Sequence, residues 1–295
     1  MLFVAAFINH TTAQESRPKV FVPGLPLSIE EYPILVDTVV SKDGKEFPLA
    51  YRKPLGDGPF PVMLFFHGGR GGKPKSIIGD DLKKATPTRF LKKGYMIVDS
   101  TRRGLKPGAP REEIEDPKSY SGGMIYDGIA AVQKTKTLPG ADPESIVIFG
   151  SSVGGSLAIE TAAQTTIAAV VAAEPTSSLW MGPKITPASF GAEQFPQFYT
   201  DDVRDFVRSV IGEFSSPFLL LHGDPSGLRR ADFSYLMREL EDLGKQAKSI
   251  GYAGYKHGFY NGGGARQMTA QELDEVIEDI HTFVFPHLKT KPEPL

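Results

Sequence analysis

The amino-acid sequence predicts an α/β fold in which helices cover both faces of a mostly parallel sheet. From about residue 34 to the end, short continuous apolar segments alternate with longer segments of helical pattern. Continuous apolar strands are typical of parallel sheets that are buried on both faces. One such segment, residues 146–149, runs directly into Gly150-Ser151-Ser152-Val153-Gly154 and then into a helix of small residues.

Eight segments are predicted as strands because they are apolar and are bounded by turn residues. Asp43-Gly44 between the first two segments indicates a hairpin, since this dipeptide suits a tight turn. In chain order, the predicted strands are 34–40, 47–53, 61–66, 95–99, 145–149, 167–173, 217–221 and 248–252.

Five segments are predicted as helices, and they separate the later strands as a parallel sheet requires. Gly94 ends the first of them, as glycine commonly does after a helix. Residues 14–30, with three prolines, are expected to be an extended lead-in. The predicted helices are 82–93, 122–136, 152–163, 231–243 and 270–285.

The stretch 174–216 interrupts this alternation. It is rich in proline, serine and phenylalanine and contains the only tryptophan, Trp180. An insertion after the sixth strand would lie over the carboxyl edge of the sheet, where such folds bind ligands. We therefore expect a small cap at 174–216 in which Trp180 contacts substrate. The alternative is a local aromatic core that only holds the insertion in place.

Composition excludes several classes of function. The chain has 295 residues, 40% of them hydrophobic and 23% charged, which suits one large soluble domain. Lys and Arg number 33 against 35 Asp and Glu, so nothing indicates a nucleic-acid partner or an anionic membrane. Because the chain has no cysteine, it has no disulfide, no zinc–thiolate site and no cysteine nucleophile. No apolar run reaches the ~18 residues of a membrane span.

The first 13 residues are a candidate signal peptide. Residues 2–8 are apolar, and Thr11-Thr12-Ala13 resembles a small-residue cleavage site, although the usual positive residues before the apolar run are missing. We therefore expect a secreted or periplasmic protein whose residues 14–295 form a single domain. The alternative is a frayed tail on a cytoplasmic protein.

Ser152 is the candidate nucleophile. It occupies the middle of Gly-x-Ser-x-Gly between a predicted strand and a predicted helix, the context in which a strained turn exposes a serine hydroxyl. The positive end of the helix dipole would point at the reaction centre. The alternative interpretation is an ordinary tight turn between strand and helix.

A serine nucleophile needs a base, and the base needs an orienting acid. His257 is the candidate base, because it lies in a loop after the last strand and late in the chain. Asp224 is the favoured acid, since it follows the apolar strand at 217–221. Glu174 is the alternative acid, because it follows the strand at 167–173. A structural loop histidine, a turn-capping Asp224 and a cap-anchoring Glu174 are the corresponding non-catalytic interpretations.

Backbone N–H groups must also stabilise the oxyanion that acyl transfer generates. The first candidate donor is Val153, which follows the nucleophile. The second is Gly69 or Arg70, because glycines after the third strand let the backbone approach a substrate. No complete phosphate-binding loop, dinucleotide fingerprint or His-Glu-x-x-His motif is present, so neither a cofactor nor a metal is expected.

Taken together, these motifs resemble the α/β-hydrolase superfamily from about residue 34 to the C-terminus. More narrowly, they are similar to its dienelactone hydrolase-like and prolyl-oligopeptidase-type branch of serine hydrolases. The resemblance implies an eight-stranded, mostly parallel sheet and a Ser-His-Asp/Glu triad. The matching segments are 61–69 (PVMLFFHGG), 99–104 (DSTRRG), 127–132 (DGIAAV), 142–146 (DPESI), 149–155 (FGSSVGG), 222–225 (HGDP) and 257–259 (HGF).

Two departures from the branch refine what the resemblance implies. Dienelactone hydrolases proper use cysteine where this chain has Ser152, which favours ester hydrolysis over that lactone chemistry. The branch usually places its aspartate later, where this chain has Ser226, so Asp224 fits only if the loop is contracted.

The resemblance therefore implies a serine esterase that forms an acyl-enzyme and acts on a small-molecule or carbohydrate-linked ester. Two alternatives are a small serine exopeptidase and a non-catalytic binding protein that retains a hydrolase fold. The peptidase is the lesser option, because peptidases of this branch carry a large propeller domain that this chain lacks. The serine at position 226 favours the binding protein, whereas intact Ser152 and His257 argue against it.

Overall fold

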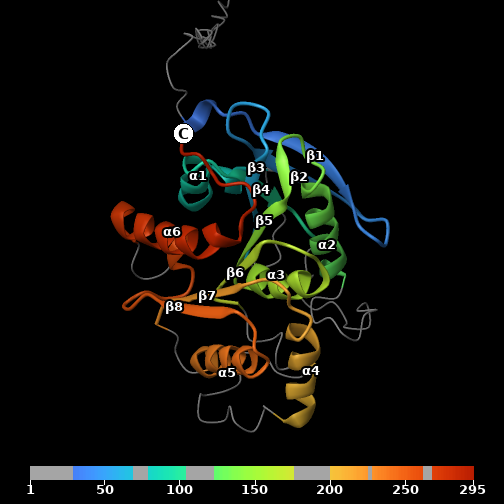
Figure 1. Ribbon diagram of the computed structural model, residues 1–295, viewed down its shortest axis with the longest axis vertical. Helices are drawn as coiled ribbons and strands as arrows, with labels where there is room; N and C mark the ends of the chain where they lie inside the picture. Colours follow the sequence, from blue (N-terminus) through green and yellow to red (C-terminus); the bar gives the residue numbers. More distant parts are fainter. Residues whose placement is uncertain (1–28, 69–78, 104–122, 176–199, 225–227, 262–267) are drawn as a thin grey trace, which may run out of the picture.

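The computed structural model describes residues 29–68, 79–103, 123–175, 200–224, 228–261 and 268–295. Some of the predictions concern residues outside these ranges, namely the candidate signal peptide at 1–13, Gly69, Arg70 and Trp180. The described residues form one eight-stranded sheet with helices on both of its faces (Figure 1).

The sheet has the strand order β1-β2-β4-β3-β5-β6-β7-β8. β1 pairs antiparallel with β2, and β2 with β4, whereas all later pairings are parallel. The prediction of an eight-stranded, mostly parallel sheet is therefore confirmed. The strands are β1 (Leu35–Val40), β2 (Glu46–Arg52), β3 (Phe60–Phe66), β4 (Met96–Ser100), β5 (Ala141–Ser151), β6 (Ala169–Ala173), β7 (Phe218–His222) and β8 (Ala247–Gly251).

Strand β3 shows why the central strands are apolar throughout. Val62, Leu64 and Phe66 belong to the hydrophobic core on one face of the sheet, and Met63 and Phe65 to the core on the other. Successive side chains of a strand point to opposite faces, so a strand covered on both sides is apolar at most of its positions.

Helices cover the sheet in two layers (Figure 1). Helices α2, α3, α4 and α5 contribute side chains to the core on one face, and α1 and α6 to the core on the other. Five of the helices correspond to the five predicted segments. The helices are α1 (Ala85–Lys92), α2 (Met124–Thr135), α3 (Val153–Gln164), α4 (Asp201–Ile211), α5 (Leu228–Asp242) and α6 (Ala270–Val284), with a short 3₁₀ turn η2 (Asp80–Lys83) before α1.

Helix α4 was not expected, because it lies within the stretch 174–216 that the sequence assigns to a cap. It begins after Thr200, whose side chain accepts the N–H of Val203 at 3.4 Å. Val207 and Ile211 are buried in the same core as α3. This part of the predicted insertion is therefore a core helix, and the part at 176–199 lies outside the described residues.

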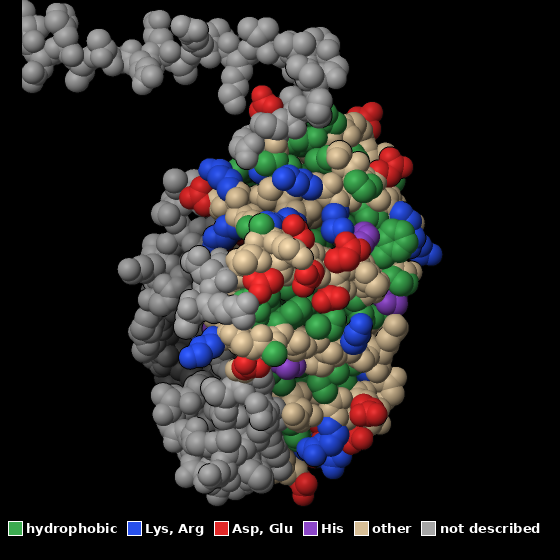
Figure 2. Space-filling model, turned by 90° about the vertical axis from the view of Figure 1, so that its left-hand side faces the viewer, with side chains coloured by type: hydrophobic (Ala, Val, Ile, Leu, Met, Phe, Trp, Pro, Cys, Tyr) green, Lys and Arg blue, Asp and Glu red, His purple; other side chains and the backbone are tan. Residues whose placement is uncertain are grey.

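The surface carries charges of both signs. On the face drawn in Figure 2, acidic and basic side chains are interspersed among neutral and hydrophobic ones. Elsewhere, ion pairs join α1 and the residue after it to α6, namely Arg89 with Asp274 and Lys93 with Glu278. None of the helices in the described part of the chain has the length and apolar composition that a membrane crossing requires.

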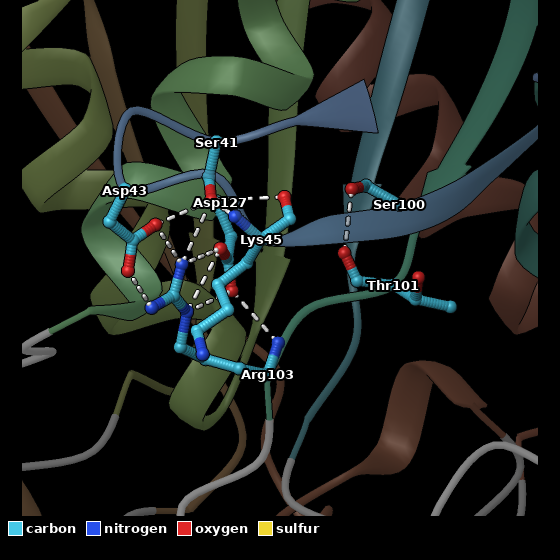
Figure 3. Close-up of polar contacts among 7 residues, drawn as sticks. All are labelled: Ser41, Asp43, Lys45, Ser100, Thr101, Arg103 and Asp127. Atoms are coloured by element: carbon cyan, nitrogen blue, oxygen red, sulfur yellow. Dashed lines mark hydrogen bonds and ion pairs between the residues drawn. The ribbon is translucent and has the colours of Figure 1, made fainter. Parts of the chain in front are cut away.

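Arg103, just beyond the end of β4, ties the β1–β2 hairpin to α2 (Figure 3). Its guanidinium donates to Asp127 on α2 and to Asp43 in the hairpin turn, with Nη2 2.7 Å from an oxygen of each. Its backbone N–H donates to Asp127 Oδ2 at 2.8 Å. Hydrogen bonds from Arg103 are the largest cause that lowers the pKa of the Asp43 carboxyl, which lies well below its usual range. Asp127 is almost fully buried, whereas the Asp43 side chain is 30% exposed.

We expect Asp127→Ala to destabilise the protein by about 3 kcal/mol, because it removes the buried partner of an ion pair. Asp43→Ala should cost about 1 kcal/mol or less, since solvent screens the outer pair. Urea unfolding of both variants measures the difference. Equal losses of unfolding free energy in the two variants would show that burial of the Asp127 carboxylate does not make its ion pair more important than the outer one.

Candidate active site

Ser152 lies in the turn between β5 and α3, where a central strand of the sheet ends and a helix begins. Its backbone has φ 53° and ψ −117°, a conformation that residues with a side chain rarely adopt. Such a conformation costs about 1–3 kcal/mol and persists only where the surrounding structure fixes it. The structure thus contains a strained turn with a serine at its apex, as the sequence predicts.

Two glycines make this turn possible. A Cβ on Gly150 would lie 2.2 Å from Gly154 O, and a Cβ on Gly154 would lie 2.1 Å from Phe66 O. Both distances are far shorter than van der Waals contact, so a side chain at either position would force α3 away from the sheet. The Gly-x-Ser-x-Gly spacing therefore reflects direct backbone packing of the turn against α3 and the end of β3.

His257 lies in the loop after β8 and faces Ser152. The distance between His257 Nε2 and Ser152 Oγ is 3.1 Å. The imidazole is 37% exposed, so solvent reaches it. The structure therefore brings together the serine and the histidine that the sequence analysis selected.

Glu174 directly follows β6 and contacts the other nitrogen of the same imidazole. Its Oε2 is 3.0 Å from His257 Nδ1, and only 4% of its side chain is exposed. The carboxylate also accepts the N–H of Gly258 at 2.5 Å and the N–H of Gly223 at 3.2 Å. Its φ of 48° lies in the left-handed region, so the backbone at Glu174 is strained as well.

The surroundings of Glu174 determine its charge. Burial raises the pKa of this carboxyl, but hydrogen bonds from His257, Gly258 and Gly223, together with the charge of His257, lower it by more. Its net pKa therefore lies below the ordinary value of 4.5, and the group is a carboxylate at neutral pH. A carboxylate only accepts hydrogen bonds, so Nδ1 of His257 carries a proton, and in the neutral ring Nε2 accepts from Ser152 Oγ.

Asp224, the acid favoured by the sequence, contacts a different part of the loop that follows β8 and carries His257. This loop, residues 252–261, is called the histidine loop below. Its Oδ2 accepts the N–H of Gly254 at 2.6 Å, and its own N–H donates to Tyr255 O at 2.6 Å. Among the described residues, the carboxylate that contacts the His257 ring is therefore that of Glu174, the alternative acid.

The residues expected to stabilise an oxyanion are described only in part. Val153 is the first residue of α3, and the N–H groups of a first helical turn have no carbonyl partner within the helix. Gly68 passes close to the serine, since a Cβ on Gly68 would lie 3.4 Å from Ser152 Cβ. The end of β3 is thus beside the candidate nucleophile, whereas Gly69 and Arg70 lie outside the described residues.

A cavity of about 400 Å³ opens beside Ser152 and His257. Phe65 and Phe149 form part of its apolar wall. Its polar wall, which the sequence does not predict, includes Asp81, Lys84 and Thr86 from η2 and the start of α1. No local motif marks these three residues, because only the packing of α1 against the sheet brings them to the site. In the described part of the chain, no three His, Asp or Glu side chains are placed to hold a metal ion.

Solved structures with the same architecture include hydrolases. A proposed dienelactone hydrolase from Klebsiella pneumoniae subsp. pneumoniae MGH 78578 superposes with a TM-score of 0.59 and 16% identity, over 85% of this chain and 98% of that one. A thermostable esterase from Pseudomonas putida ECU1011 gives a TM-score of 0.62 and 18% identity, over 90% of this chain and 86% of the esterase.

The protein has the α/β-hydrolase fold. The strained turn at Ser152, the histidine loop after β8 and the carboxylate after β6 all lie at the carboxyl edge of this α/β-hydrolase sheet. The recognition made from the sequence motifs is therefore confirmed at the level of the fold.

Sequence comparison gives a curated relative. The quorum-quenching protein AidA of Acinetobacter baumannii (strain MDR-ZJ06) is 28% identical over 214 residues, and the match covers 70% of this chain. The match spans 60% of the length of AidA. No family model matches the chain.

The lowered pKa of Glu174 predicts a pH-dependent contribution to stability. The unfolded carboxyl takes up a proton more readily than the folded one, so the contribution is complete above pH 4.5 and is lost as pH falls through the lower folded pKa. We expect the stability difference between wild type and Glu174→Gln to shrink in that acidic range. Thermal melts of both proteins between neutral and acidic pH measure it, and a difference independent of pH would contradict this account.

Proposed function

We propose that the protein is a serine hydrolase that cleaves carboxylic esters through an acyl-enzyme on Ser152. The observation that carries the proposal is the hydrogen-bonded series from Ser152 Oγ to His257 Nε2, and from His257 Nδ1 to Glu174, beside a cavity. A serine hydroxyl is a poor nucleophile at neutral pH, and this arrangement of base and orienting acid activates it. The esterases among the structural neighbours support the same reaction class.

In the first half of the proposed reaction, His257 Nε2 accepts the proton of Ser152 as Oγ bonds to the ester carbonyl carbon. The tetrahedral intermediate then expels the alcohol, which takes that proton from His257. In the second half, His257 removes a proton from water, and the resulting hydroxide attacks the acyl carbon. The carboxylic acid leaves, and the proton returns to Ser152.

Glu174 would hold His257 in the required tautomer and stabilise the imidazolium that forms in each half of the reaction. The N–H of Val153 and a backbone N–H at Gly69 or Arg70 would bind the oxyanion. Donors of this kind typically contribute about 10²–10³-fold to kcat.

The pairing of Glu174 with His257 also bears on the proposed alternative of a non-catalytic binding protein. That alternative rested on the serine at position 226, which left the expected acid missing. A carboxylate from the end of β6 fills the role, so the missing aspartate is no longer a reason to doubt catalysis. We propose Glu174, rather than Asp224, as the acid of the triad.

We expect Ser152→Ala to abolish hydrolysis of p-nitrophenyl esters, with a loss of about 10⁶-fold in kcat. The wild-type protein should react covalently with a fluorophosphonate probe, and Ser152→Ala should not. Ser209→Ala, which alters an exposed serine of α4, is the matched control and should leave both readouts unchanged. A loss of less than about tenfold in Ser152→Ala would refute the assignment of the nucleophile.

Two isosteric variants test the choice of acid. Glu174→Gln should lower kcat by about 10⁴-fold, because it no longer fixes the productive tautomer of His257. Asp224→Asn keeps an oxygen that can accept from Gly254 N–H, so its loss should stay within about tenfold. Both variants are assayed on one ester at one pH. The reverse pattern would restore Asp224 as the acid, and two mild variants would mean that neither carboxylate orients the base.

A further inference from the structure

The hydroxyl of Tyr260 lies where the three segments that carry the candidate triad meet. Tyr260 Oη is 2.6 Å from Ser151 Oγ and donates to Ala173 O at 3.3 Å. Ser151 directly precedes the candidate nucleophile, and Ala173 directly precedes the candidate acid. Tyr260 itself follows His257 by three residues. One buried hydroxyl therefore belongs to the histidine loop and contacts both of the other segments.

These two contacts lie next to the two strained positions of the site. Among the residues that the structure describes, Ser152 and Glu174 are the non-glycine residues with positive φ, at 53° and 48°. Strained backbone persists only where its neighbours over-determine it. Tyr260 contacts the residue immediately before each of these two, so its hydroxyl restrains both turns at once.

Tyr260 can hold the histidine loop against Ser151 and Ala173 because its own position is fixed. It is 1% exposed. Its ring packs edge-on against Phe149 of β5, with centroids 5.7 Å apart and planes at 72°. Its backbone carbonyl accepts a hydrogen bond from Thr86 Oγ1 of α1 at 2.6 Å. The ring and the backbone thus anchor the residue independently of its hydroxyl.

The donors and acceptors among Ser151, Tyr260 and Ala173 follow from the number of protons available. A phenol has one proton, so when Tyr260 donates to Ala173 O, Ser151 Oγ is the donor to Tyr260 Oη. Ala173 O also accepts the backbone N–H of Ser152 at 2.9 Å. The series from Ser151 through Tyr260 to Ala173 therefore links the ends of β5 and β6 through the histidine loop, beside the direct backbone link.

We propose that Tyr260 is a positioning residue whose hydroxyl holds the histidine loop where His257 meets both Ser152 and Glu174. The inference rests on the proposed hydrolase function of this site. Ser151 and Tyr260 also line the cavity, but Tyr260 is 1% exposed and its hydroxyl contacts Ser151 and Ala173. The hydroxyl therefore acts through these two residues, so its loss should slow the chemical steps and leave substrate binding nearly unchanged.

The test is Tyr260→Phe, which removes the hydroxyl and keeps the packed ring. Because small misplacements of reacting groups cost up to about 10²-fold, kcat on a p-nitrophenyl ester should fall about 10- to 100-fold, with KM changed less than about threefold. Labelling of Ser152 by a fluorophosphonate should slow in parallel. Ser151→Ala should lower kcat in the same way. The double variant Ser151→Ala/Tyr260→Phe should have a kcat no lower than that of the worse single variant, because both changes break the same series of hydrogen bonds.

Tyr95→Phe is the matched control. Tyr95 is also fully buried, its hydroxyl lies 2.9 Å from His281 Nδ1, and its ring packs edge-on against Phe90 on the side of α1 and α6. It should lower the melting temperature about as much as Tyr260→Phe and leave kcat unchanged. A Tyr260→Phe variant with kcat within about twofold of wild type would overturn the proposal. A higher KM at unchanged kcat would overturn it too, because the hydroxyl would then bind substrate.

A second readout does not depend on turnover. The proton on His257 Nδ1, identified by loss of its NMR signal in His257→Gln, should exchange slowly with water while Glu174 accepts its hydrogen bond. Tyr260→Phe should speed this exchange roughly tenfold, and Tyr95→Phe should not. If wild type cleaves no ester, the proposed function fails while this measurement still tests the positioning role. Unchanged exchange in Tyr260→Phe would overturn that role.

Discussion

The parallel pairing of β5 with β6 is the constraint on which the candidate site depends. Ser151 and Ala173 are partners at the carboxyl ends of these strands, so the next residues, Ser152 and Glu174, leave the sheet side by side. The N–H of Ser152 then donates to Ala173 O, which extends the pairing into the turn. Ser152 and Glu174, the proposed nucleophile and acid, are therefore placed by backbone hydrogen bonds, and only His257 has to be brought in by a loop.

Glu174 connects this sheet edge to that loop. A buried carboxylate without partners would cost several kcal/mol, and here N–H groups from Gly223 and Gly258 and the ring of His257 offset that cost. The same contacts hold the end of β7 and the histidine loop against the end of β6. The group that fixes the tautomer of His257 thus also fixes the position of the loop that carries it.

Local patterns in the sequence predicted most of the fold and part of the site. All eight strands and five helices follow from apolar runs and turn residues, and Ser152 and His257 follow from the glycine spacing and the order along the chain. Helix α4 was not predicted, because the whole stretch 174–216 is rich in proline and phenylalanine and was therefore assigned to a cap. Within it, Val203, Val207 and Val210 have the spacing of one helix face. The choice between Asp224 and Glu174 stayed open in the sequence, because the ends of β6 and β7 each bear a carboxylate and sequence spacing does not rank them.

By itself, the sequence determined the sheet, its helical layers and the strained turn at Ser152, because apolar periodicity and the sterics of glycine act over a few neighbouring residues. Only the tertiary structure decided which carboxylate reaches His257 and where the hydroxyl of Tyr260 lies. Both depend on the order of strands in the sheet and on the path of a loop that joins residues more than 80 positions apart in the chain. Contacts of that range leave no periodic pattern in the sequence, so they appear only once the chain is folded.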